Sequence, residues 1–560
     1  MCQFHACNLG IAAVALTKLR RFCNALADVR CGAILDGSHA AGDALLLTVT
    51  VRLFPLRYAV ILSRLFCICV ALVVAAAAAQ GPTAAEPTAK SALPDRVVNL
   101  LREANFPQDA LGVVVLRASD GMPVLEHRAN EAMQPASTLK TLTSIVALER
   151  LGPSYRGKTE LRSVADLKAG TLSGDVVLRG LGSPDFDWRA LQRMLQTLRF
   201  SGVTTIEGDV ILDRTYFQPS RPDVGVPPFD ETPEFAYNVI PDALSLNSNL
   251  LQLEIASDEA TVRVGVTPML DGVTVDSNMK VVDKPCADWE DFWKLPEVKK
   301  ADDGRIRVTL KGEFPRNCPL TTEISVLDRV DYADRLFRST WRGLGGTWTG
   351  VARDGAGSAD GRVLAVHQSR TLAEFNRDIL KRSDNPVTRL TYLALGAESK
   401  AADATRDGAT LSTGARAEQV IRQWLREKKI NDNGLVLDNG AGLSRTERVT
   451  PAMLAAVLRV ARESRWAPEF LAAMPIVGVD GGMRKRLADS AAVGVARIKT
   501  GGLRNVVSVA GFVPDVNGDP CIVVAILNHD DAKSAVGKPI VDALLEWVTR
   551  VDSRAILLTR

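Results

Sequence analysis

Three short polar motifs, in a fixed order and widely spaced, constrain the fold of this 560-residue chain more than any other feature. An S-x-x-K motif occupies residues 137–140, an S-x-N motif residues 383–385, and a K-T-G motif residues 499–501. The second motif begins 246 positions after the first, and the third begins 116 positions after the second. If the three motifs form one site, the fold must bring distant parts of the chain together around a long inserted segment.

Ser137 and Lys140 stand at the start of a predicted helix. Pro135 marks its boundary, and apolar residues follow at helical spacing: Leu139, Leu142 and Val146. Positions i and i+3 share a helix face, so the hydroxyl and the amine can meet at the helix N-terminus. A serine becomes a nucleophile when a base takes its proton, and a lysine serves as that base only if its pKa is lowered. An N-cap serine is the alternative interpretation.

The first two motifs each occur a second time. S-x-x-K recurs at residues 277–280, inside a strand-like alternating run, and S-x-N recurs at residues 245–247. We prefer Ser383 because helical segments flank it and the K-T-G motif follows at a suitable distance.

Composition excludes several classes of function. The apolar fraction is 46% and the net charge is +3, so the chain is an ordinary globular protein without the charge excess typical of nucleic-acid binding. There are only five His and no C-x-x-C pair, so neither a metal site nor a cofactor is indicated. The length is sufficient for two or three domains.

Residues 51–79 have the features of a secretory signal peptide. Arginines precede a short apolar core at residues 65–74 and a run of five alanines, and cleavage is predicted after Ala79. A retained membrane anchor is the alternative, although the core is short for a spanning helix. We therefore expect a periplasmic or otherwise exported protein with no stable membrane span after cleavage. Residues 1–50 are an N-terminal extension of uncertain nature, and translation beginning near Val51 is one hypothesis for it.

Only Cys286, Cys318 and Cys521 remain after removal of the signal peptide. In an exported protein Cys286 and Cys318 could form a disulfide, and the sequence leaves the paired and unpaired states equally open. Cys521 lies in an apolar run and is predicted to be a buried free thiol.

Hydrophobic patterning divides the rest of the chain into four parts. Residues 80–92 are rich in Ala, Pro and Thr and are predicted to be a linker. Residues 93–160 contain a helix, two strands and the Ser137 helix, whereas short alternating runs dominate residues 161–328 and predict a β-rich insertion. Residues 329–560 return to helical patterning and end with three strand candidates and a helix. The predicted strands on either side of the insertion are 111–117, 123–127, 493–500, 506–513 and 521–527.

These elements predict an α/β (α+β) fold. Strands from the two ends of the chain would share one five-stranded antiparallel sheet flanked by helices, and the β-rich insertion would interrupt this domain.

The chain resembles the class C low-molecular-mass penicillin-binding proteins, the D-alanyl-D-alanine carboxypeptidase/endopeptidases, over about residues 93–560. The resemblance rests on the three ordered motifs, a set typical of penicillin-interacting serine enzymes, and on further segments: Ile206–Asp209, Leu244–Asn247, Gly442–Arg445 and Val449–Pro451. It implies a penicillin-binding transpeptidase-like domain, with two domains, one nested in the other, between the first two motifs. The glycine-rich stretch at residues 180–184 is looser than in the family.

The resemblance also implies the catalytic roles. Ser137 would attack the carbonyl of the penultimate D-alanine and form an acyl-enzyme, with Lys140 as the base. Ser383 would relay a proton to the leaving amine, and Asn385 would hold Lys140 and a substrate amide.

The K-T-G segment would bind the substrate. Lys499 and Thr500 would hold the carboxylate of the terminal D-alanine, and Gly501 would let the substrate lie close to the strand. The backbone N–H groups of Ser137 and Gly502 would form the oxyanion hole. The implied partners are peptidoglycan stem peptides ending in D-Ala-D-Ala, with β-lactam antibiotics as inhibitors.

Two other functions compete with this interpretation. A serine β-lactamase would share the motifs, but the long β-rich insertion argues against it. A non-catalytic peptidoglycan-binding protein would not need the complete set of motif residues. Class A β-lactamases use a glutamate to activate water, but Glu427 falls at the polar end of a predicted helix and is predicted to be a surface residue.

Overall fold

The computed structural model describes residues 4–5, 46–47, 92–358, 360–399, 405–406 and 409–555. The chain divides into two compact units, Met1–Ala89 and Lys90–Arg560. In the first, strands β1 (Phe4–His5) and β2 (Leu46–Leu47) pair antiparallel. The predicted signal peptide, the linker up to residue 91 and the rest of the N-terminal extension lie outside the described residues.

None of the helices in the described part of the chain is both long enough and apolar enough to cross a membrane.

Both ends of the second unit contribute to one five-stranded sheet, with all neighbours antiparallel. This confirms the predicted sheet. Its order is β23-β24-β25-β3-β4, and its strands are β3 (Leu111–Arg117), β4 (Pro123–His127), β23 (Arg497–Leu503), β24 (Val506–Pro514) and β25 (Pro520–Asn528).

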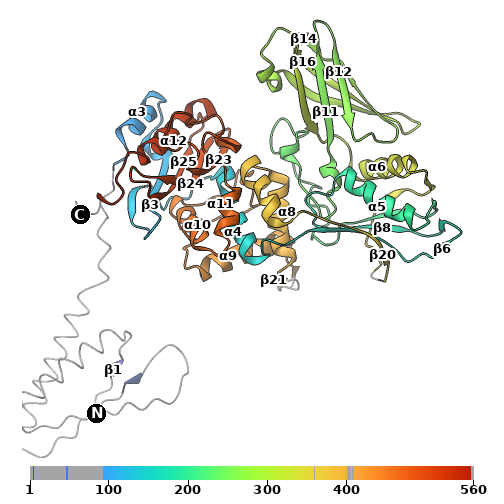
Figure 1. The fold of residues 1–560 in the computed structure, drawn as a ribbon, viewed down its shortest axis with the longest axis horizontal. Coiled ribbons are helices and arrows are strands. Elements are labelled where there is room, and N and C mark those ends of the chain that lie inside the picture. The colour runs from blue at the N-terminus through green and yellow to red at the C-terminus, as the bar shows by residue number, and fades with distance from the viewer. Residues whose placement is uncertain are drawn as a thin grey trace, which may run out of the picture. The chain divides into compact units, whose positions relative to one another are not determined.

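The central strands are largely apolar because helices cover both faces of the sheet. In β25, Ile522 and Val524 pack into one core, whereas Val523 and Ala525 pack into the other, as the alternation of strand side chains requires. Helices α3 (Asp95–Glu103) and α12 (Ser534–Val548) contribute to the second core and lie together in Figure 1.

The first core contains most of the remaining helices of this domain, including the one that follows Ser137. They are α4 (Lys140–Arg150), α7 (Leu372–Arg377), α8 (Asn385–Ala397), α9 (Thr413–Glu427), α10 (Pro451–Glu463) and α11 (Ala467–Ala473). A short hairpin precedes α9, and each of its strands, β21 (Thr405–Arg406) and β22 (Ala409–Thr410), has two residues.

The insertion contains two structural layers, one nested in the other. The outer layer is a five-stranded mixed sheet in the order β19-β10-β8-β5-β20, with a smaller sheet beside it in the order β18-β9-β7-β6. Its strands are β5 (Lys158–Ser163), β6 (Leu167–Lys168), β7 (Thr171–Leu172), β8 (Val176–Leu181), β9 (Thr205–Ile206), β10 (Val210–Asp213), β18 (Thr347–Trp348), β19 (Ala352–Asp354) and β20 (Arg362–Gln368).

The nested layer is built of antiparallel and parallel strands, and the 3-10 helix η5 (Cys286–Phe292) connects β14 to β15. In Figure 1 its strands extend beyond helix α6, which contacts them through an ion pair between Asp331 and Lys300 of β15. They are β11 (Leu251–Ser257), β12 (Val262–Thr267), β13 (Val273–Ser277), β14 (Lys280–Val282), β15 (Trp293–Lys300), β16 (Ile306–Pro315) and β17 (Pro319–Ile324).

The insertion ends later than the predicted boundary at residue 328. Helix α6 (Arg329–Gly343) buries Leu336 and Trp341 in the same core as α5 (Trp188–Phe200), and β19 and β20 are the two edge strands of the outer sheet. The insertion therefore extends to about residue 368. Helical periodicity shows that a helix has a buried face, but not which sheet covers that face, and this is why the sequence placed α6 in the wrong domain.

Candidate functional site

Ser137 lies in a 3-10 turn, η2 (Ala136–Leu139), that continues directly into helix α4 at Lys140. The α-helix thus begins three residues later than predicted, with a tighter turn in place of its first turn. Side chains at i and i+3 eclipse each other in a 3-10 turn. The Ser137 hydroxyl and the Lys140 amine therefore still meet, and Oγ and Nζ are 2.9 Å apart.

The carbonyl of Pro135 anchors this turn to the five-stranded sheet. It accepts hydrogen bonds from Thr138 Oγ1 at 2.7 Å and from Ser508 Oγ, on β24, at 2.6 Å. Both hydroxyls are fully buried, so water does not compete for these bonds. The position of Ser137 is fixed by the sheet as well as by its own helix.

Lys140 is fully buried and has three oxygen neighbours. Besides the Ser137 hydroxyl, its Nζ lies 2.6 Å from Asn385 Oδ1 and 2.5 Å from the carbonyl oxygen of Ala441. A neutral amine has two N–H groups and one lone pair. With the N–H groups directed at the two carbonyl oxygens, the lone pair faces the Ser137 hydroxyl, which then donates to it.

The surroundings of Lys140 favour this neutral form. Burial holds the pKa of the Lys140 amine well below its usual range, and the nearby charge of Lys499 lowers it further. The carboxylates of Glu447 and Asp384 act in the opposite direction. The site thus meets the requirement for a lysine that acts as a base.

The second and third motifs meet beside this pair. Lys499, on the edge strand β23, is also buried, and its Nζ donates to Ser383 Oγ at 2.9 Å and to the Thr500 carbonyl at 2.7 Å. Burial lowers the pKa of Lys499 to about 7. Ser383 has a left-handed backbone, with φ of 61°, directly after the π-helical turn η6 (Asp378–Arg382). All three predicted motifs therefore lie in one cluster.

Gly501 of the K-T-G-G segment allows β23 to approach the Ser137 turn. A Cβ atom at Gly501 would lie 2.9 Å from the Ser137 nitrogen and 2.9 Å from the Pro135 carbonyl oxygen, closer than side chains tolerate. Gly502 follows on the same edge strand and has open space at its Cβ position. The Ser137 N–H and the edge of β23 thus lie side by side.

Two backbone groups that were not predicted from the sequence also belong to the site. The Ala441 carbonyl contacts Lys140, and the carbonyl of Tyr237 accepts a hydrogen bond from Asn385 Nδ2 at 3.1 Å. Tyr237 belongs to the insertion, so the insertion reaches the site itself. Backbone acceptors leave no residue-type signal, although the resemblance had already drawn attention to the segment at 442–445.

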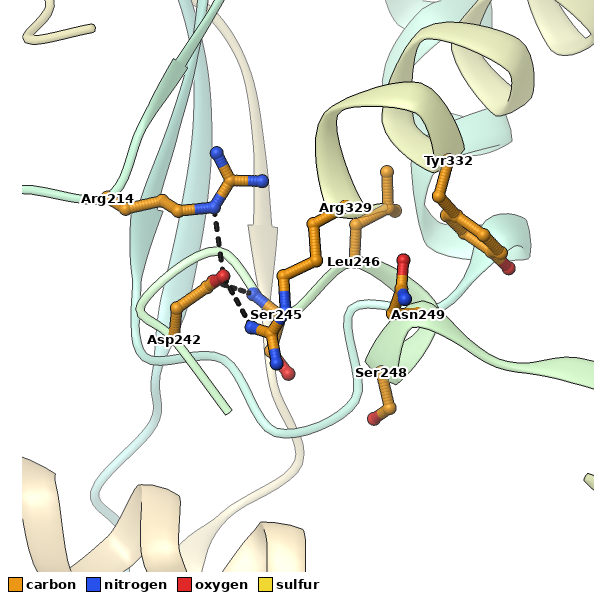
Figure 2. Close-up of a pocket in the computed structure, with 8 residues that line it drawn as sticks. All are labelled: Arg214, Asp242, Ser245, Leu246, Ser248, Asn249, Arg329 and Tyr332. Carbon is orange, nitrogen blue, oxygen red and sulfur yellow. Dashed lines mark hydrogen bonds and ion pairs between the residues drawn. The ribbon is translucent and has the colours of Figure 1, made fainter. Parts of the chain in front are cut away.

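The second copies of the motifs lie elsewhere. Figure 2 shows a small cavity in the insertion, where Ser245 lies near an ion pair between Arg214 and Asp242. None of the eight residues that line this cavity belongs to the Ser137 cluster. Ser277 ends β13 and Lys280 begins β14, so that S-x-x-K copy is not helical.

Glu427 lies at the end of α9, and its side chain is 44% exposed and paired with Arg150. It is a surface residue, as predicted. In the described part of the chain, no group of three or more His, Cys, Asp or Glu residues is arranged to hold a metal ion.

Residues 93–551 match the D-Ala-D-Ala carboxypeptidase 3 (S13) family. The chain belongs to this peptidase family. It is therefore a serine-type D-Ala-D-Ala carboxypeptidase, with the fold of a penicillin-binding protein.

Two relatives of this carboxypeptidase support the assignment. A D-alanyl-D-alanine carboxypeptidase from an Actinomadura species is 27% identical over 454 residues, which are 78% of this chain and 81% of that protein. The D-alanyl-D-alanine carboxypeptidase DacB from Haemophilus influenzae is 25% identical over 424 residues, 75% of this chain and 85% of that protein.

A solved structure shares the fold of the carboxypeptidase. The crystal structure of penicillin binding protein 4 from Haemophilus influenzae superposes with a TM-score of 0.67 at 22% identity, and the match covers 81% of this chain and 99% of that one. The same protein in complex with a β-lactam gives a TM-score of 0.63 at 21% identity, covering 81% and 100% of the two chains.

The three cysteines of the described region fall into two classes. Cys286 and Cys318 are joined by a disulfide, with Cα atoms 5.4 Å apart, inside the nested layer of the insertion. Cys521 is a free, buried thiol in β25, packed in the core of the main sheet.

We predict that Gly442→Ala slows D-alanine release from a D-Ala-D-Ala peptide by about 10²-fold, the cost expected for a misplaced catalytic group. Gly442 has φ of 79°, and a Cβ there would collide with the Ala136 carbonyl and lie 2.8 Å from the Ser137 nitrogen. Gly343→Ala is the control, since nothing lies within 4 Å of its Cβ position. Equal rates for the two variants would contradict the prediction.

Proposed function

We propose that Ser137 is the nucleophile of an exported D-Ala-D-Ala carboxypeptidase/endopeptidase that trims peptidoglycan stem peptides and is acylated by β-lactams. The observation that carries this proposal is the buried Lys140 amine, which lies within hydrogen-bonding distance of both Ser137 Oγ and Asn385 Oδ1. A non-catalytic binding protein has no need of a desolvated lysine beside a serine hydroxyl, because its burial is costly.

In the acylation step, Lys140 takes the proton of the Ser137 hydroxyl as Oγ attacks the carbonyl carbon of the penultimate D-alanine. The N–H groups of Ser137 and Gly502 stabilise the negative charge on the carbonyl oxygen, and losing one such donor typically costs about 10²–10³ in rate. The C–N bond then breaks, and the leaving amine receives a proton through Ser383. Water completes the reaction by hydrolysing the acyl-enzyme.

The Lys499 ammonium and the Thr500 hydroxyl bind the free carboxylate of the terminal D-alanine. The carboxylate of a penicillin has the same chemistry and binds at the same place. Lys499 also donates to Ser383, so carboxylate binding and the proton relay share one residue. Gly501 and Gly502 allow the substrate backbone to lie along the edge of β23.

The proposal includes export. The predicted signal peptide at residues 51–79 supports a periplasmic or other cell-envelope location, and so does the Cys286–Cys318 disulfide, since disulfides persist in oxidising compartments. N-terminal sequencing of the mature protein should begin after Ala79. A mature protein that still begins with residues 1–50 would contradict the predicted cleavage.

We predict that the full chain and a Ser277→Ala variant form a lasting covalent adduct with a fluorescent penicillin, whereas Ser137→Ala does not. Ser277 is the matched control because it is the serine of the second S-x-x-K copy. Labelling is read on a denaturing gel.

Two other outcomes would replace the proposal. Rapid destruction of penicillin without a lasting label would identify a β-lactamase. If neither penicillin nor a D-Ala-D-Ala peptide reacts, the protein binds peptidoglycan without catalysis.

A second prediction concerns pH. Lys499 must be charged to bind a carboxylate, and burial lowers its pKa to about 7. The ammonium is therefore lost as pH rises through this value, and kcat/KM for a D-Ala-D-Ala peptide should fall on the alkaline side, because kcat/KM follows the ionisation of the free enzyme. A peptide with an amidated C-terminus is the control, since it offers no carboxylate. If both peptides show the same alkaline fall, Lys499 does not act through the carboxylate.

A further inference from the structure

Glu447 is a buried carboxyl group that the proposed mechanism does not use. Its side chain is fully buried and interacts electrostatically with the Lys140 amine. Its Oε1 accepts the backbone N–H groups of three successive residues, Asp438 at 3.2 Å, Asn439 at 3.0 Å and Gly440 at 2.8 Å. Its Oε2 has no hydrogen-bond partner among the described residues. Such an unpaired oxygen is costly to bury, so this placement requires an explanation.

The three N–H groups belong to the loop that supplies the Ala441 carbonyl. Gly440 is fixed from the other side by Thr143 Oγ1, which donates to its carbonyl at 2.7 Å, and Asn439 Oδ1 accepts the Ala441 N–H at 3.0 Å. The direction of the Ala441 carbonyl therefore depends on the conformation of this loop, which the three hydrogen bonds to Glu447 stabilise. That carbonyl is 2.5 Å from Lys140 Nζ.

We propose that Glu447 is a positioning residue for acylation, acting on Lys140 through the Ala441 carbonyl and through its own negative charge. The inference rests on the proposed function, because it assigns Glu447 a part in the proton transfer from Ser137. With Asn385 Oδ1 and the Ala441 carbonyl occupied by the two N–H groups of Lys140, the lone pair is directed at the Ser137 hydroxyl. A shifted Ala441 carbonyl would release one N–H and misdirect the lone pair.

The charge of Glu447 acts within a buried group of charges. Lys140 is approached by Lys499 from β23, by Asp384 and Arg389 at the start of α8, and by Glu447 from the loop. Asp438, Arg389 and Tyr392 also lie near Glu447. Burial raises the pKa of Glu447 above its usual value, and the three N–H donors offset only part of that rise. In its ionised form, which the three donors to Oε1 stabilise, the carboxylate favours the ammonium form of Lys140 and so limits the fall of the Lys140 pKa.

Three substitutions separate the positioning of the Ala441 carbonyl from the effect of the negative charge on Lys140. Glu447→Gln keeps the side-chain length and the oxygen acceptor but removes the charge. Glu447→Asp keeps the charge but withdraws the oxygen by one methylene, and Glu447→Ala removes both. Glu427→Gln is the control, a glutamate exposed at the end of α9. The readout is the second-order rate of acylation by a fluorescent penicillin as a function of pH, with thermal melting to show that each variant is folded.

We expect Glu447→Gln to retain the acylation rate within about threefold at its optimum, with the acid limb of its pH profile moved to lower pH. The sign follows because loss of a nearby negative charge lowers the pKa of Lys140, so the neutral base persists in more acidic solution. Folded Glu447→Asp and Glu447→Ala should each lose at least about tenfold, and Glu427→Gln should match the wild type.

The outcomes distinguish this inference from the proposed function. If the wild type shows no acylation that depends on Ser137, the proposed function fails and the role of Glu447 fails with it. If the wild type is acylated and the folded Asp and Ala variants react equally fast, only the role of Glu447 is overturned. An acid limb that does not move in Glu447→Gln would overturn the electrostatic part. If the Ala variant does not fold, the Asp variant and the Gln profile decide.

Discussion

The burial of two lysine amines in one polar cluster is the constraint on which the rest of the site depends. Lys140 and Lys499 are both enclosed, and each is surrounded by oxygen acceptors rather than by carboxylate partners at ion-pair distance. Desolvation of an amine favours its neutral form. A fully charged pair would be expensive to bury, which agrees with the proposed roles of Lys140 as the base and of Lys499 as the group that binds a carboxylate. The elements around the site can be understood as means of holding these two amines in place.

The fold supplies those means from distant parts of the chain. The central sheet brings β3 from one side of the insertion next to β25 from the other, and Ser508 on β24 fixes the turn that carries Ser137. Helix α8 begins at Asn385, so the start of a helix delivers the amide oxygen to Lys140. The loop around Ala441 contributes a backbone carbonyl that contacts Lys140. Because each part is anchored to a sheet or a helix, the amines cannot relax toward solvent.

Sequence patterns predicted the sheet and the motif residues well, for physical reasons. Strands covered on both faces are continuous apolar runs, as β25 shows, and the motif side chains are rare combinations of residue types at fixed spacing. The end of the insertion was not predicted because the amphipathic pattern of α6 does not say which sheet it packs against. Ala441 and Tyr237 were missed because they act through carbonyl oxygens, and Glu447 was missed because a single glutamate in a loop resembles a surface residue.

The hydrogen bond from Asn385 Nδ2 to the Tyr237 carbonyl joins the insertion to the site through a backbone group. A side-chain contact can be lost by one codon change, but a carbonyl is present whatever residue occupies position 237. The link between the insertion and Asn385 can therefore persist while the sequence around position 237 diverges. Side-chain replacements within the insertion would leave the acceptor in place, and only a replacement of Asn385 would remove the donor. From the insertion side, the bond would be broken by a change in the path of the backbone, such as a deletion or an added residue in that loop.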